Sequence, residues 1–224
     1  MNTARERVLG RVRNALGRRD GDPQARSRAE GYLAARAHGP RPTLPTDLVT
    51  RFMQRAGDME STIERVASVG EIPARVARYL DALELPAALA AQKSHAGVCW
   101  PEFAKLDWPG AGLSIEARPT IGQDRLGITS VFCGIAETGT MVILPGVETP
   151  TATTLLPDTH IAVLRAGRIV PGMEEAFALV IRERSSMPRA VNLISGPSRT
   201  GDIEQTIVLG AHGPFRVHIL LIEE

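Results

Sequence analysis

Apolar and polar residues alternate along this chain in blocks that predict short strands and amphipathic helices. Apolar side chains at helical spacing predict helices over residues 3–17, 47–57, 71–83 and 172–185. Short apolar or alternating runs predict strands at residues 61–69, 97–100, 113–116, 131–136, 141–144, 160–164, 190–195, 206–209 and 215–222. Strands interspersed with helices indicate an α/β domain with an open, largely parallel sheet and flanking helices.

The first 45 residues differ from the rest in charge and in pattern. Residues 1–30 hold eight arginines against four acids, and the predicted helix 3–17 carries an apolar stripe beside its arginines. Such a helix either binds a membrane surface or packs on its own domain or a partner, and its lack of Trp and Phe favours packing. Residues 18–45 have Pro and Gly without periodicity, so we interpret them as a linker with a short helix beginning near Tyr32.

The composition is that of an ordinary globular protein and excludes several classes. Of the 224 residues, 43% are hydrophobic and 23% are charged, and the net charge of +1 argues against a general nucleic-acid binder. The two cysteines, Cys99 and Cys133, cannot supply the four ligands of an iron–sulfur cluster within one chain. Without an apolar signal core or a run long enough to span a membrane, we expect a cytoplasmic protein with reduced thiols.

Glu137 is the acid with the most interesting sequence context. The residues Glu137-Thr138-Gly139-Thr140 separate two apolar runs, which predicts a β-hairpin with a polar turn. A carboxylate at this turn can act as a base or as a covalent nucleophile. The alternative is a solvated turn residue, with Gly139 supplying a positive φ.

A second polar loop, Ser195–Glu204, follows an apolar run that we predict to be a buried strand. Asp202 and Glu204 then fit the first turn of a short helix, which gives a strand–loop–helix unit. At the carboxyl end of a strand, the hydroxyls of Ser198 and Thr200 and the guanidinium of Arg199 can face an anion. The alternative is a plain turn with a surface arginine.

The remaining candidates each have two interpretations. His212, between two predicted strands, is an acid, base or ligand, or else a turn residue. Arg125 is either an anion contact or half of a surface ion pair. His160, His218 and Cys133 sit within apolar strands and are predicted to be core residues. No HExxH, Walker A or dinucleotide-binding glycine pattern occurs in the sequence.

Four segments, in order, resemble those of one family. Ile194–Glu204 is similar to the signature ISGPSRTxDIE, with Gly201 in place of an expected Ala. The other three are Ala136–Thr140 (AETGT), Leu155–Ile161 (LLPDTHI) and Leu209–Pro214 (LGAHGP). Together they resemble the lactate utilization protein C family, LutC/YkgG, with its LUD domain, over about residues 120–220. Residues 46–224 would then form the LUD α/β domain, and residues 1–45 the basic helix and linker.

The resemblance implies a NagB/RpiA/CoA-transferase-like fold and a role in oxidising L-lactate to pyruvate. In that role the chain is a component of an L-lactate dehydrogenase or oxidase complex, it carries no cofactor, and iron–sulfur clusters lie in partner subunits. The alternatives are a free-standing enzyme acting on a phosphorylated, folate or acyl-CoA ligand, or a non-catalytic scaffold. The candidate catalytic residues are Glu137 and His212, and the candidate residues for an anionic small molecule are Thr138, Gly139, Thr140, Ser195, Gly196, Ser198, Arg199, Thr200, Asp202 and Arg125.

Overall fold

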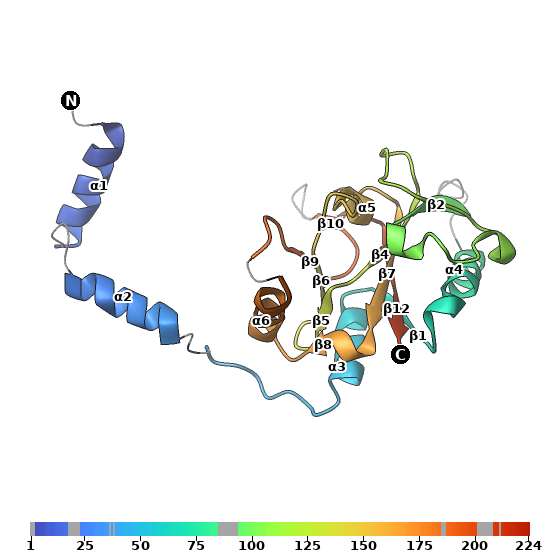
Figure 1. Cartoon of the computed structure of the whole chain (residues 1–224), viewed down its shortest axis with the longest axis horizontal. Helices are drawn as coiled ribbons and strands as arrows, with labels where there is room; N and C mark the ends of the chain where they lie inside the picture. Colours follow the sequence, from blue (N-terminus) through green and yellow to red (C-terminus); the bar gives the residue numbers. More distant parts are fainter. Residues whose placement is uncertain are drawn as a thin grey trace. The chain divides into compact units, whose positions relative to one another are not determined.

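The chain divides into two compact units, Met1–Pro42 and Thr43–Glu224 (Figure 1). The structure is a computed structural model, and it describes residues 3–17, 23–35, 37, 39–84, 94–184, 187–200, 208–210 and 212–224. Every buried apolar side chain of the described residues belongs to the larger unit.

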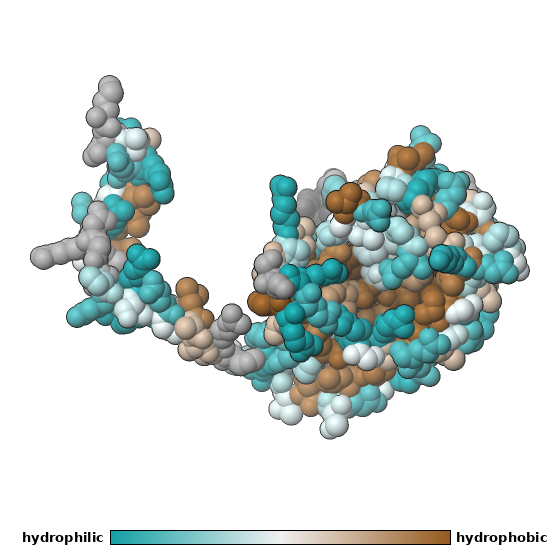
Figure 2. All heavy atoms as spheres, viewed as in Figure 1, coloured by the Kyte–Doolittle hydropathy of each residue, from teal (hydrophilic) through white to brown (hydrophobic). Residues whose placement is uncertain are grey.

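The first unit contains two helices, α1 (Ala4–Ala15) and α2 (Pro23–Ala35). α1 begins at a capping box, in which the Thr3 hydroxyl accepts the N–H of Glu6 at 3.3 Å and the Glu6 carboxylate accepts the N–H of Thr3 at 2.7 Å. Neither helix has a buried residue, and Figure 2 shows their surface to be largely hydrophilic. The predicted helix near the N-terminus is therefore confirmed, with its apolar stripe exposed.

Helix α2 corrects our interpretation of residues 18–45 as a linker. The prolines and all glycines of this segment except Gly31 lie before Gln24 or after Ala35. The other residues of the helix are mostly Ala, Arg, Gln and Glu, which favour helix. Pro23 occupies the first turn, where its missing N–H costs nothing, and Arg26 pairs with Glu30 one turn later at 2.9 Å. We had placed the start of this helix near Tyr32, which lies in its last turns.

Six parallel strands form the main sheet of the second unit. Their spatial order is β1-β12-β7-β4-β2-β3, and every neighbouring pair is parallel. The strands are β1 (Thr62–Val66), β2 (Ala96–Cys99), β3 (Ser114–Ala117), β4 (Leu126–Ser130), β7 (Thr159–Arg165) and β12 (Arg216–Ile222). The α/β class with a largely parallel sheet, flanking helices and a helical N-terminal extension is confirmed.

Helices cover both faces of this sheet. Ile161 and Val163 of β7 belong to a core cluster with α4 (Ile72–Asp81), whereas the alternate residues Ala162 and Leu164 pack in a cluster with α3 (Leu48–Asp58). Such alternation between two apolar faces is what a central parallel strand requires. The predicted helices 47–57 and 71–83 are thus confirmed as the two covering layers.

A smaller four-stranded sheet carries the polar turn. Its order is β8-β5-β6-β9, and β5 and β6 form the predicted antiparallel hairpin. The strands are β5 (Cys133–Ile135), β6 (Thr140–Ile143), β8 (Ile169–Val170) and β9 (Asn192–Ile194). α6 (Met173–Arg184), predicted as helix 172–185, packs on β5 and β8, and α5 (Ala152–Leu155) is a single turn before β7.

The strand predicted before Ser195 is present, but its expected sheet and its expected burial are wrong. β9 pairs with β6 in the small sheet, not with the parallel strands, and Leu193 is 43% exposed rather than buried. The loop after β9 leads into a two-residue strand, β10 (Arg199–Thr200), which pairs with β11 (Val208–Leu209). The short helix predicted to begin at Asp202 falls on residues that the structure does not describe, so it stays a prediction. Residues 201–207, which include Asp202, lie outside the described residues.

Candidate functional site

The turn of the β5–β6 hairpin is pressed against helix α3. Gly139 has φ +70°, and its N–H donates to the carbonyl of Ile135 at 2.9 Å. A Cβ at this position would collide with the backbone nitrogen of Ala56. Only glycine adopts this positive φ without strain and leaves room for the backbone of Ala56. Packing and backbone conformation together therefore require glycine at position 139.

Three hydroxyl groups join this turn to the loop after β9. Thr138 Oγ1 lies 2.7 Å from Thr140 Oγ1, which in turn lies 2.7 Å from Ser195 Oγ. Three hydroxyls carry three hydrogens, and the two bonds within the chain use only two of them. One O–H of the three is therefore available for another acceptor.

The C-terminal end of α3 also holds the loop that begins at Ser195. Gly196 has φ +84°, and a Cβ there would collide with the carbonyl oxygen of Met59. The next residue, Glu60, is a non-glycine residue at φ +65°, and its carboxylate pairs with the Arg199 guanidinium at 3.1 Å. A backbone in this region is strained for a residue with a Cβ, and such strain is concentrated at functional sites.

A pocket of about 280 Å³ lies between this loop and the loop after β11. The two loops are tied together by their backbones, because Ser198 N–H donates to Pro214 O at 3.0 Å and Gly210 N–H donates to Ser198 O at 2.9 Å. His212 is exposed at the pocket. The lining residues are Thr154, Leu155, Leu193, Ile194, Ser195, Gly196, Pro197, Ser198, His212, Gly213 and Pro214.

Four of the predicted site residues therefore meet at one place: Ser195, Gly196, Ser198 and His212. Thr138 and Thr140 reach this place only through the hydroxyl chain to Ser195. The pocket combines hydroxyls and one imidazole with an apolar wall, which suits a small polar molecule with an apolar side. We refer to these lining residues as the signature pocket.

Glu137 does not line the signature pocket. Its N–H donates to Pro171 O at 3.0 Å, and its half-buried carboxylate faces Gly172 at the start of α6. Glu174 and Glu175 approach the same glycine, and the Glu175 carboxylate accepts the Gly172 N–H at 3.1 Å. The structure thus places Glu137 among acids at a helix N-terminus, where the helix dipole stabilises negative charge.

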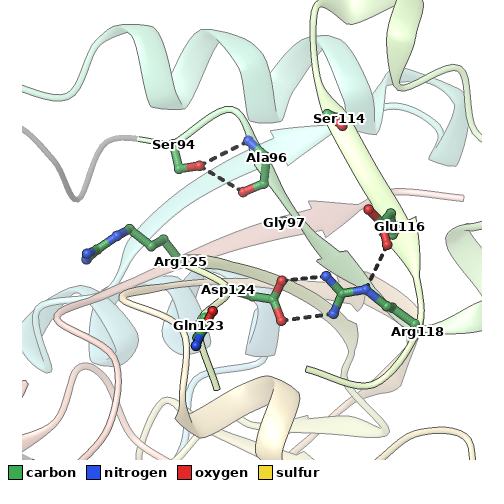
Figure 3. A pocket seen from close by; sticks show the side chains of 9 residues that line it. All are labelled: Ser94, Ala96, Gly97, Ser114, Glu116, Arg118, Gln123, Asp124 and Arg125. Atoms are coloured by element: carbon green, nitrogen blue, oxygen red, sulfur yellow. Dashed lines mark hydrogen bonds and ion pairs between the residues drawn. The ribbon is translucent and has the colours of Figure 1, made fainter. Parts of the chain in front are cut away.

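Arg125 lies in a different pocket, of about 310 Å³, shown in Figure 3. Its guanidinium pairs with Asp158 at 2.5 Å. Of the two interpretations of Arg125, an anion contact or an ion pair, the structure shows the ion pair. In Figure 3 the neighbouring Asp124 turns the other way and accepts two hydrogen bonds from Arg118, at 2.8 and 3.0 Å. Hydrogen bonds from that guanidinium lower the pKa of Asp124 to about 2, so this carboxylate stays ionised.

His160, His218 and Cys133 lie in the core, as predicted, and Cys99 is buried as well. His160 Nε2 lies 2.8 Å from Thr129 Oγ1, and burial lowers the pKa of His160 to about 4. His218 stacks on Tyr79 with ring centroids 4.0 Å apart, and burial lowers its pKa to about 4 as well. Burial raises the pKa of the Cys99 and Cys133 thiols to about 11, so both are inert as nucleophiles at neutral pH.

Sequence reasoning missed one residue near this site and only partly anticipated another. Glu60 carries no sequence signal, because nothing in a Met-Glu-Ser run predicts a left-handed backbone. Leu155 begins a segment that resembles the family, yet we gave it no role in a site. Of the predicted residues, Asp202 lies outside the described part of the chain, and only the backbone of Thr200, in β10, is described.

The family of this chain follows from sequence comparison. A sequence model of the LUD domain matches residues 101–222, more than half of the chain. The chain belongs to the LUD domain family. The match contains the signature pocket, whereas α3 and Glu60 precede it.

Curated relatives carry the name lactate utilization protein C. The protein from Bacillus licheniformis is 31% identical over 129 residues, which are 56% of this chain and 54% of the relative. The one from Bacillus subtilis is 32% identical over 130 residues (53% and 54%), and the one from Anoxybacillus flavithermus 37% over 113 residues (50% and 48%). This LUD domain chain spans about half the length of the curated relatives it matches.

The LUD domain fold also matches a solved structure. The crystal structure of a DUF162 family protein from Deinococcus radiodurans, at 1.70 Å resolution, superposes with a TM-score of 0.55 at 21% sequence identity. The match covers 81% of this chain and 99% of that one, and it shows the shared fold. Within the residues that the structure describes, no helix is long and apolar enough to cross a membrane, and no group of three or more His, Cys, Asp or Glu side chains is placed to hold a metal ion.

Proposed function

We propose that this LUD domain chain acts in lactate utilization, as one subunit of a bacterial system that oxidises L-lactate to pyruvate. The observation that carries the proposal is the signature pocket. Parts of three of the four segments that resemble lactate utilization protein C, separated by up to about 60 residues in the chain, line this one pocket. Relatives of that name are 30 to 37% identical over the matched region, which supports the same assignment.

The pocket takes a small anionic molecule in this proposal. Ser195 and Ser198 supply hydroxyls, His212 gains a positive charge when it is protonated, and Arg199 lies in the strand that follows the loop. Leu155 and Pro214 give the pocket an apolar side. A 2-hydroxy acid such as lactate carries a carboxylate, a hydroxyl and a methyl group, and the pocket offers a counterpart for each.

The oxidation itself requires an acceptor for electrons. L-lactate loses two electrons and two protons when it becomes pyruvate, and the proposal assigns the electrons to iron–sulfur clusters of partner subunits. Both cysteines of this chain lie in its core as free thiols. The role of this subunit is then to bind and orient an anionic ligand, and to hold its partners.

The first test is an anaerobic pull-down of the tagged chain from its own cells grown on lactate. The eluate is analysed for iron, for companion subunits and for lactate-dependent dye reduction. The proposal expects all three to be recovered together. Recovery of the chain alone, without activity, contradicts it and favours a free-standing enzyme acting on sugar phosphates, folates or acyl-CoAs.

Substitutions then test the pocket within the recovered complex. Ser198→Ala and His212→Ala are expected to lower lactate-dependent dye reduction roughly tenfold, the effect of losing one hydrogen bond to a charged ligand. Ser114→Ala is the matched control, because this exposed serine lines the separate pocket of Figure 3. Unchanged activity in both pocket variants would leave only the scaffold role.

Glu137→Gln distinguishes the proposal from covalent catalysis by this carboxylate. Glu137 faces Gly172 and does not line the signature pocket, so the amide is expected to retain most of the activity. A nucleophilic or basic Glu137 predicts instead a loss of about a thousandfold or more. A covalent adduct at Glu137, seen as a mass increase of the intact chain, would support the enzyme alternative.

A further inference from the structure

A third pocket, of about 400 Å³, lies at the carboxyl end of the parallel sheet. It is lined by residues that end or follow β1, β2, β4 and β7, and it includes none of the segments that resemble the family. The lining residues are Val69, Glu102, Phe103, Ser130, Val131, Phe132, Val163, Arg165 and Arg168. We call it the sheet-end pocket.

The course of the chain explains why a crevice forms here. After β2, Phe103 packs in the core cluster that contains α4, on one face of the sheet. After the neighbouring β4, Val131 packs in the cluster that contains α3, on the other face. Segments that leave adjacent parallel strands toward opposite faces open a crevice between them, and ligands of open α/β sheets bind at such points.

The two arginines of the sheet-end pocket differ in their partners. Arg168 is fully engaged: it donates to Phe132 O at 2.9 Å, pairs with both carboxylate oxygens of Glu183 at 2.6 and 3.0 Å, and lies 4.6 Å above the Phe132 ring. The Arg165 side chain is exposed and makes no hydrogen bond or ion pair with another described residue. Arg168 therefore holds the aromatic wall in place, and Arg165 is the cation that can meet a ligand.

The rest of the lining is apolar at its centre. Phe103, Val131 and Val163 are 3 to 7% exposed, and Phe132 is half-buried beneath Arg168. The only acid of the pocket is Glu102, which is exposed. A ligand site of this size is usually apolar with a few convergent polar groups, and this pocket has that character.

We propose that the sheet-end pocket binds a small organic carboxylate, with its apolar body against Val131 and Phe132 and its carboxylate at Arg165. The site is separate from the signature pocket and shares no residue with it. It therefore does not depend on the lactate utilization role. The proposal gives this LUD domain a second ligand site, built by the sheet rather than by the signature loops.

The test uses benzoate and its neutral analogue benzamide with the ¹⁵N-labelled full-length chain. Amide chemical shifts are followed during titration at low ionic strength, where an exposed cation has its full effect. We expect saturable shifts around residues 130–132 and 163–165, and tighter binding of benzoate than of benzamide. Arg165→Ala should weaken benzoate binding threefold to tenfold and remove the preference over benzamide, while Arg165→Lys restores part of it.

Arg189→Ala is the matched control, since this exposed arginine lies outside the sheet-end pocket and its loss changes the net charge equally. It should leave the affinity within twofold of the unsubstituted chain. The proposal fails if benzoate causes no saturable shift at these residues. It also fails if Arg165→Ala binds benzoate as the control does. Activity of the lactate system does not enter this test, so the two proposals can fail separately.

Discussion

At the residue scale, Glu60 shows how one unfavourable backbone conformation can fix a site. Its φ of +65° turns the chain at the end of α3 and directs the carboxylate to Arg199. Both side chains of this ion pair are substantially exposed, at 35% and 58%, so the pair itself adds little stability. The conformation of Glu60 is therefore held by the packing around it rather than by the ion pair.

Glycine and alanine at position 60 should separate these two effects. Both remove the ion pair, but only glycine relieves the left-handed strain, so we expect Glu60→Gly to be more stable than Glu60→Ala by about 1 kcal/mol. Urea unfolding at neutral pH measures the difference. At Asp58, the exposed last residue of α3, the order should reverse, because alanine favours helix. Alanine equal to or better than glycine at position 60 would show that no strain is stored there.

The two buried histidines predict a loss of stability in mild acid. Burial lowers the pKa of His160 and of His218 to about 4. Between that value and the unfolded value of about 6.5, the unfolded chain binds protons that the folded chain excludes, so the free energy of unfolding falls as the pH decreases. Each histidine contributes a slope of at most about 1.4 kcal/mol per pH unit. The pKa of Asp124 is about 2, so its contribution to the free energy of unfolding is lost only below about pH 4.

His160→Gln should remove the share of this slope that His160 contributes. Unfolding free energies measured by urea at pH 5, 6 and 7 would show a shallower decline than in the unsubstituted chain. Thr129→Val is the control, because it removes the hydrogen-bond partner at 2.8 Å but leaves the imidazole buried. It should be less stable at pH 7 with its slope retained. An unchanged slope in His160→Gln would mean that His160 does not titrate as its burial implies.

At the element scale, the end of α3 organises the candidate site. The tip of the β5–β6 hairpin packs on Ala56, and the loop after β9 packs on Met59, each through a glycine with positive φ. A chain of hydroxyls then joins the two segments. Because one helix end supports both segments, a shift of α3 would move the hairpin and the loop together.

Two glycine substitutions test this packing. Gly139→Ala places a Cβ against the backbone of α3 and also strains a φ of +70°, so we expect a destabilisation of roughly 3 kcal/mol or more. Gly112→Ala has a similar φ of +74° but open space around the new Cβ, and should cost only about 1 kcal/mol. Thermal and urea unfolding compare the two. Equal losses would show that the hairpin does not rest on α3.

Elements with their own periodicity could be predicted from the sequence, and elements defined by a partner could not. α3, α4 and α6 have apolar faces that show in the residue spacing, and β7 and β12 are continuous apolar runs. β4 escaped prediction, although four of its five residues are buried, because Gly and Thr interrupt its apolar pattern. β9 was assigned to the wrong sheet, since strand pairing is set by distant residues.

The candidate site was predictable to a similar degree. The polar turns and their glycines stand out in the sequence, and the structure brings Ser195, Ser198 and His212 to one pocket. The direction in which the Glu137 side chain points could not be deduced, because it depends on where α6 begins. The sheet-end pocket had no local signal at all. It results from the order in which β2, β4 and β7 lie side by side.

At the scale of the whole molecule, the chain combines a self-sufficient α/β unit with a helical extension. All described core residues lie between Phe52 and Ile222, and the LUD match begins at residue 101. Val8 and Val12 of α1, and Leu16 at its C-cap, are 49 to 61% exposed, beside arginines that give the helix a positive charge. An exposed amphipathic stripe of this kind is available to an acidic partner surface.

Removal of residues 1–42 should therefore leave the fold intact. None of the residues in α1 or α2 is buried, so we expect Thr43–Glu224 to unfold within about 2 °C of the full chain. Far-ultraviolet circular dichroism should lose the signal of two helices and no more. A large drop in the melting temperature would show that the extension stabilises the α/β unit.

The same deletion should abolish association with partner subunits if the first unit is a docking arm. In the pull-down from lactate-grown cells, the shortened chain should recover little companion protein although it is folded. Two full-length variants then separate the electrostatic from the hydrophobic contribution to docking. The first removes the positive charge of α1 by placing glutamine at Arg5, Arg7, Arg11 and Arg13. The second removes its apolar stripe by placing serine at Val8 and Val12. An acidic partner groove requires both features, so each variant should weaken recovery, the first more strongly at low salt. Full recovery with the shortened chain would assign docking to the α/β unit instead.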